Sequence, residues 1–175
     1  YAFGYGFSAS PLQLARAYSI LANDGLRREV SMTAIDEYQD ESVRVINADI
    51  VKTVRQMLET AASDQGTGRR ALIDGYSVGG KTGTARKLKA TGGYDENRHM
   101  SLFAGLSPIN NPRLVTVVVI DEPNEDTYAG GLVAAPVFSE VTGSALRLLQ
   151  VTPDAGCCFQ LLPLSAADVL AAARI

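Results

Sequence analysis

Apolar residues recur along the first third of the chain at helical spacing in two stretches, with less regular sequence between them. The periods predict helices over 11–23 and 47–62. Ser10 and Asn47 stand where N-capping residues are expected, and proline suits the first position of the earlier helix. Residues 29–35 and 42–46 instead carry short alternating patterns, which predict strands or extended segments.

From about residue 76 the spacing changes to the alternation that is typical of strands. Three strands are predicted, over Tyr76–Ala85, His99–Ser107 and Arg113–Ile120, and a closing helix over Pro136–Leu149. The connections contain turn-forming residues and are short, which favours antiparallel neighbours. The fold class predicted is therefore α+β, with helices flanking an antiparallel sheet. Beyond residue 154 lies a weakly patterned tail, 155–175, whose part 165–174 is helix-prone.

The composition is that of a globular protein. The 175 residues are 46% hydrophobic and 20% charged, and the net charge of −3 offers no electrostatic case for nucleic acid. Cys157 and Cys158 are adjacent, so they make a poor disulfide, and no second pair has metal-ligand spacing. His99 is the only histidine and thus the one candidate for a histidine general base, but a position at the surface or packing in a strand explains it, and no role is assigned to it.

The stretch around Lys81 fits two incompatible motifs. Gly75-x-x-x-x-Gly80-Lys81-Thr82 matches the phosphate-binding loop of nucleotide-binding proteins. Such a loop must follow a buried strand and open a helix, whereas only four residues, 71–74, are available before it for a strand. Glycine and β-branched threonine follow it, which disfavours a helix. The architecture therefore argues against nucleotide binding.

As part of a strand, the same residues form a peptide-binding edge. Gly79, Gly80 and Gly83 remove side chains, so an extended peptide can pair with the backbone. Lys81 supplies a positive charge for an anionic terminus. Thr82 and Thr84 add hydroxyl groups on one face, because alternate strand residues point the same way. Lys-Thr-Gly alone also fits an ordinary edge strand, so the motif needs support from elsewhere.

That support comes from a longer match. The segments occur in one order at family spacing: Gly4-Tyr5-Gly6, Pro11-Leu12-Gln13-Leu14-Ala15, Gly80-Lys81-Thr82-Gly83-Thr84-Ala85-Arg86-Lys87, Tyr128-Ala129-Gly130-Gly131 and Ala135-Pro136-Val137-Phe138. Together they resemble the class B penicillin-binding proteins, in particular division-specific peptidoglycan D,D-transpeptidases. The resemblance covers residues 1–154 and implies the penicillin-binding transpeptidase fold that serine β-lactamases share.

The resemblance also implies roles for individual residues. Lys81, Thr82, Gly83 and Thr84 would belong to the catalytic cleft, with the Thr84 backbone N–H in the oxyanion hole and both threonine hydroxyls on the substrate carboxylate. Gly80, Tyr128 and Gly130 would contact substrate, with Tyr128 as a wall of the cleft. Ala129 replaces a second aromatic residue that many relatives have beside this tyrosine. No cofactor is expected.

Two family motifs are absent from these residues. No serine is followed by lysine three positions later, and none by asparagine or aspartate two positions later. We therefore expect this chain to be the carboxyl-terminal part of a catalytic domain, inactive alone, with the nucleophile in the remainder of that domain.

The expected partners are stem peptides ending in D-Ala-D-Ala, β-lactams and divisome membrane proteins, at the periplasmic face of the inner membrane. An elongation-class relative and a β-lactam sensor stay open as alternatives.

Overall fold

The computed structural model describes residues 8–33, 41–89, 91–124 and 127–155. Its elements are α1 (Pro11–Ala22), β1 (Leu26–Arg27), β2 (Val43–Arg44), α2 (Ala48–Ala62), the short 3₁₀ helix η1 (Arg69–Ala71), β3 (Gly79–Leu88), β4 (Tyr94–Ser107), β5 (Leu114–Asp121) and α3 (Gly130–Leu148). The Gly4-Tyr5-Gly6 segment, both cysteines and the helix expected over 165–174 lie outside the described residues.

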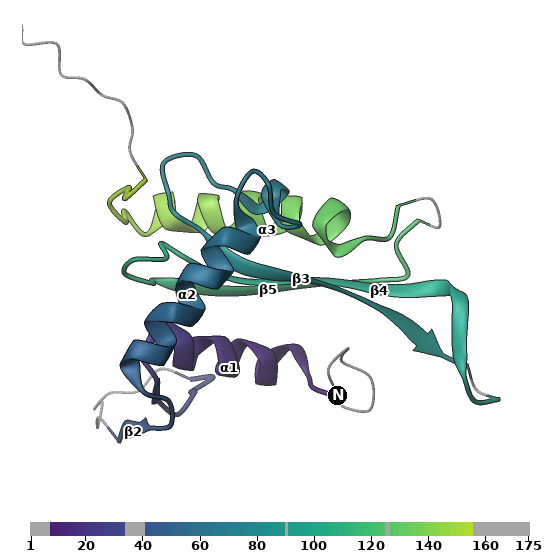
Figure 1. Ribbon diagram of the computed structural model, residues 1–175, viewed down its shortest axis with the longest axis horizontal. Helices are drawn as coiled ribbons and strands as arrows, with labels where there is room; N and C mark the ends of the chain where they lie inside the picture. Colours follow the sequence, from purple (N-terminus) through teal and green to yellow (C-terminus); the bar gives the residue numbers. More distant parts are fainter. Residues whose placement is uncertain (1–7, 34–40, 90, 125–126, 156–175) are drawn as a thin grey trace, which may run out of the picture.

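The centre of the molecule is the antiparallel sheet β3-β4-β5, so the predicted meander is confirmed. The register places Lys81 opposite Ala104, and Ala104 opposite Val117. At the β3–β4 turn, Gly92 and Gly93 have φ of 90° and 78°, values that glycine adopts without strain. Figure 1 shows this hairpin reaching beyond the rest of the sheet. Within the described residues β3 pairs only with β4, which leaves its other edge unpaired.

Helices cover both faces of this sheet. In Figure 1, α3 lies above the sheet and α1 below it, while α2 crosses the end of β3. The core between the sheet and α3 contains Phe103 from β4 and Phe138 from α3, whose ring centroids are 4.7 Å apart. Both side chains are fully buried. This packing fixes the distance between α3 and the sheet, because close-packed interiors tolerate little displacement.

The first two helices begin where the sequence predicts. Ser10 caps α1 in a reciprocal capping box with Gln13, and Pro11 takes the first helical position. Asn47 caps α2 by accepting a hydrogen bond from the Asp49 N–H. Local side chains therefore set both start points.

Other boundaries differ from the sequence prediction. Helix α3 begins at Gly130 and includes Pro136, so the expected start at Pro136 is wrong by almost two turns. Strand β4 begins at Tyr94, five residues before the expected start. Residues 94–98 are a polar stretch without alternation, and the strand includes them because it pairs with β3 as far as Tyr94. No strand occupies residues 28–33; the short pair β1 and β2 joins Leu26–Arg27 to Val43–Arg44 instead.

Candidate active site

The exposed edge of β3 carries the Lys-Thr-Gly motif. Lys81 is exposed, and its Nζ donates to the Thr82 carbonyl at 2.9 Å and lies 3.3 Å from Thr82 Oγ1. The Thr82 hydroxyl is 3.1 Å from the hydroxyl of Thr67, which belongs to the loop after α2. A cation and two hydroxyl groups therefore converge beside an unpaired strand edge.

Thr84 contacts the beginning of α3. Its Oγ1 accepts a hydrogen bond of 3.0 Å from the Gly130 N–H. The N-cap residue of α3 is Ala129, which has no side-chain oxygen, so the helix has no cap of its own. Thr84 provides the missing acceptor from a neighbouring strand. Thr82 and Thr84 both face α3, as strand alternation predicts.

Two glycines at the start of α3 allow this close approach. A Cβ added to Gly130 would lie 2.4 Å from the Gly83 carbonyl oxygen and 2.5 Å from that of Leu102. A Cβ on Gly131 would lie 2.2 Å from the Thr67 carbonyl oxygen. The helix therefore rests directly on the backbone of β3, β4 and the loop. Positively polarised N–H groups at the helix start consequently lie next to the motif.

Tyr128 is held against β4 by two contacts. Its ring stacks on His99, with centroids 3.9 Å apart and an angle of 10° between the planes. Its carbonyl accepts a hydrogen bond from the hydroxyl of Ser101, which is fully buried. Tyr128 itself is 42% exposed, so one side of the ring region stays open to solvent. His99 is buried on its strand, in agreement with the packing interpretation of the sequence.

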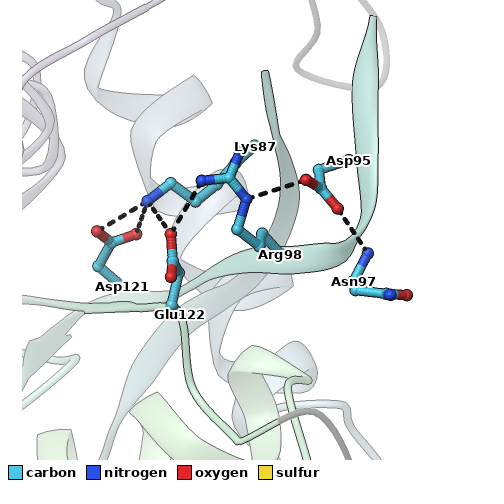
Figure 2. A network of polar contacts seen from close by, with 6 residues as sticks. All are labelled: Lys87, Asp95, Asn97, Arg98, Asp121 and Glu122. Atoms are coloured by element: carbon cyan, nitrogen blue, oxygen red, sulfur yellow. Dashed lines mark hydrogen bonds and ion pairs between the residues drawn. The ribbon is translucent and has the colours of Figure 1, made fainter. Parts of the chain in front are cut away.

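A network of ion pairs lies at the end of the sheet that carries the β3–β4 hairpin (Figure 2). Lys87 Nζ contacts Asp121 at 3.0 Å and Glu122 at 2.6 Å, which joins β3 to the end of β5 across β4. Hydrogen bonds to Glu122 and then Asp121 raise the pKa of Lys87. Arg98 bridges Asp95 and Glu122. The hydrogen bond from the Asn97 N–H, and then that from Arg98, lower the pKa of Asp95.

The structure thus brings most of the sequence-predicted site residues together. Lys81, Thr82, Gly83 and Thr84 line one strand edge, with Gly130 hydrogen-bonded to it and Tyr128 two residues earlier. Gly80 is buried, and a Cβ there would lie 2.5 Å from the Phe103 ring, so packing alone explains this glycine. Its contact with substrate stays a prediction.

Two contributors were not found from the sequence, Thr67 and Ser101, and the stacking of His99 on Tyr128 was not predicted either. Ser101 gave a weak signal as a polar residue within a predicted strand. Thr67 gave none, because it lies in a loop without periodicity.

The nucleotide-binding alternative is wrong. Lys81 lies inside a strand that continues to Leu88, so no helix N-terminus opens there to receive phosphate. The antiparallel sheet with helices on both faces and Lys-Thr-Gly on its edge strand agrees with the fold that the sequence resemblance implies.

Comparison with known proteins identifies the family. The model of the penicillin binding protein transpeptidase domain matches residues 1–143. The chain therefore belongs to the penicillin-binding protein transpeptidase family.

Two curated relatives and one solved structure illustrate the similarity. The "Probable peptidoglycan D,D-transpeptidase PenA" of Neisseria flavescens is 45% identical over 151 residues, 86% of this chain and 37% of the relative. "Peptidoglycan D,D-transpeptidase FtsI" of Escherichia coli K12 is 41% identical over 155 residues, 89% and 26% of the two chains. The apo structure of the TP domain from Burkholderia pseudomallei penicillin-binding protein 3 has a TM-score of 0.80 and 42% identity, covering 89% of this chain and 47% of that one.

The chain thus spans between a quarter and two fifths of the length of these curated relatives, and less than half of the solved domain. In the part of the chain that the structure describes, every helix is too short or too polar to cross a membrane.

Proposed function

We propose that this chain is the carboxyl-terminal part of a peptidoglycan D,D-transpeptidase that cross-links stem peptides during septal wall synthesis. The observation that carries the proposal is the edge of β3 that no other described strand pairs with, where Lys81, Thr82 and Thr84 lie beside the start of α3. An extended peptide can add to such an edge through backbone hydrogen bonds. Its terminal carboxylate would receive charge-assisted hydrogen bonds from the lysine and hydroxyl groups.

The reaction proposed is a double acyl transfer. A serine in the rest of the domain attacks the carbonyl of the penultimate D-Ala, the peptide C–N bond breaks, and terminal D-Ala leaves with a proton on its amine. An amine of a neighbouring stem peptide then attacks the ester and releases the serine hydroxyl. The Thr84 N–H would stabilise the oxyanion at each tetrahedral stage. A β-lactam would follow the first half only, because its leaving group stays attached.

Two observations support the finer assignments. The names of relatives such as FtsI and PenA favour a peptidoglycan transpeptidase over a β-lactam sensor. Arg86-Lys87 after the motif favours the septal over the elongation class. Since peptidoglycan lies outside the inner membrane, we place the enzyme at the periplasmic face of that membrane. Its proposed partners are divisome membrane proteins. Residues 80–84 are proposed to bind the substrate carboxylate.

The test uses a fluorescent penicillin and intact-mass measurement. The full-length protein that contains this chain should form a one-to-one covalent adduct. Residues 1–175 alone should form none, because the chain contains no Ser-x-x-Lys sequence. A stable adduct on residues 1–175 would place the nucleophile within this chain, and failure of the full-length protein to react would refute the transpeptidase proposal.

A further inference from the structure

The loop between α2 and β3 holds one threonine hydroxyl next to the motif. Thr67 Oγ1 lies 3.1 Å from Thr82 Oγ1, although fourteen residues separate the two in sequence. This hydroxyl pair is the only direct polar link between the loop and β3 that the described residues show outside their backbone hydrogen bonds. No step of the reaction described above uses it.

The backbone around Thr67 is held from two sides, and the residue itself is exposed. The Gly68 N–H donates to the Ala61 carbonyl at 2.9 Å, which ties the loop to the end of α2. The Thr67 carbonyl lies against Gly131 so closely that a Cβ there would approach it to 2.2 Å. The loop thus has α2 on one side and the start of α3 on the other. These backbone contacts hold Thr67 where its hydroxyl contacts Thr82 of β3.

The direction of the Thr67–Thr82 hydrogen bond decides whether the Thr82 hydroxyl proton is available to a substrate. A threonine hydroxyl has one proton and two lone pairs. Lys81 Nζ can only donate, so it uses one lone pair of Thr82 Oγ1. If Thr82 gives its proton to Thr67, it has none for a substrate carboxylate. If Thr67 donates instead, the second lone pair is filled and the Thr82 proton is free to point to the carboxylate.

We infer that Thr67 is a positioning residue, which donates to Thr82 Oγ1 when an anion binds and so directs the Thr82 O–H toward that anion. The inference rests on the proposed function of β3 as the carboxylate site. Thr67 itself needs no contact with substrate. Because its hydroxyl both donates and accepts, it satisfies Thr82 in the free and the bound state by reversing the hydrogen bond.

The test compares Thr67→Val with Thr67→Ser in the full-length protein. Valine keeps the shape and removes the hydroxyl, whereas serine keeps the hydroxyl. One neutral hydrogen bond corresponds to roughly a three- to tenfold change in rate. We therefore expect Thr67→Val to lower the second-order rate of acylation by a penicillin by about that factor, and Thr67→Ser to restore most of the rate.

A penicillin methyl ester separates positioning from simple structural support. The ester carries no anion, so the Thr82 proton has little to orient toward, and Thr67→Val should slow its reaction by less than twofold. Equal slowing of acid and ester would show that the loop acts only as structural support, and would overturn the inference. So would an unchanged rate in Thr67→Val while Thr82→Val is slow. If no variant and no parent reacts with either compound, the proposed function itself fails.

Discussion

At the scale of single residues, the motif combines one permanent charge with hydroxyl groups that already have partners. Lys81 is exposed and directed to the backbone of its own strand, and no carboxylate of the described residues forms an ion pair with it. Its charge is therefore available for an anion that enters the cleft. A threonine contributes only a hydrogen bond to the carboxylate, whereas the lysine contributes a hydrogen bond and a positive charge, so the lysine should matter more than either threonine.

The first prediction concerns Lys81→Ala and Thr82→Val in the full-length protein. Thr82→Val should slow acylation by penicillin about ten- to a hundredfold, as expected for a charge-assisted hydrogen bond of roughly 1.5–3 kcal/mol. Lys81→Ala should slow it further, because charge and hydrogen bond are both lost. The measurement is the second-order acylation rate by stopped flow. A parental rate in Lys81→Ala would show that this strand edge is not the carboxylate site.

The sequence correctly places the residues of the motif on one strand, but it does not indicate which contacts they make with other segments. Lys81, Thr82 and Thr84 form a recognisable run, so their chemistry was visible without coordinates. Thr67 and Ser101 act through contacts with segments distant in the chain, and so does the hydrogen bond from Gly130, a residue that the sequence indicated only as a substrate contact. Such contacts leave no periodicity or spacing in the sequence from which they could be predicted.

At the scale of elements, the main feature is a helix capped by a strand. The buried Gly130 N–H, at the start of α3, depends on Thr84 of β3 for its acceptor. The sequence suggested a later start at Pro136, since Gly130-Gly131 has low helix propensity and proline favours a first turn. Tertiary contacts overcame this local preference, because only glycines permit the backbone approach at that point.

The second prediction follows from this shared cap. Thr84→Val should lower the free energy of unfolding by about 1–3 kcal/mol, since it leaves the buried Gly130 N–H without its partner. Thr84→Ser should retain most of the stability. Thr53→Val offers a matched control, because that threonine lies on exposed α2 and its hydroxyl bonds only within its own helix. The measurement is urea unfolding of the full-length protein. If Thr84→Val loses no more free energy of unfolding than Thr53→Val, Thr84 does not cap α3.

At the scale of the whole molecule, the end of the sheet opposite the hairpin is closed by residues that follow α3. Asp154 accepts hydrogen bonds from the Ser77 N–H at 2.8 Å, the Ser77 hydroxyl and the Asn110 amide. The Tyr76 hydroxyl donates to the Val151 carbonyl at 2.7 Å. The carboxyl-terminal segment up to residue 155 is therefore attached to the start of β3 and to the β4–β5 connection.

The third prediction uses the titration of Asp154. Partial burial raises its pKa, but hydrogen bonds from Ser77 and Asn110 outweigh this and hold the pKa below its ordinary value. A lowered folded-state pKa means that the stabilisation is fully present above about pH 4, the value for unfolded aspartate, and is lost as pH falls through the folded pKa. Melting temperature should therefore drop more steeply below pH 4 in the parent than in Asp154→Asn. Parallel curves would show that this carboxylate does not stabilise the fold.

The contact between Gly131 and the Thr67 loop has a consequence for the time course of synthesis. Gly131 is translated about 50 residues after Thr82, which at roughly 5–20 residues per second is a delay of about 2–10 seconds. During that interval the ribosome has already produced the Lys-Thr-Gly segment while the helix that immobilises it does not yet exist. An exposed strand edge invites pairing with other chains. The nascent polypeptide would therefore be most vulnerable to aggregation just before α3 emerges.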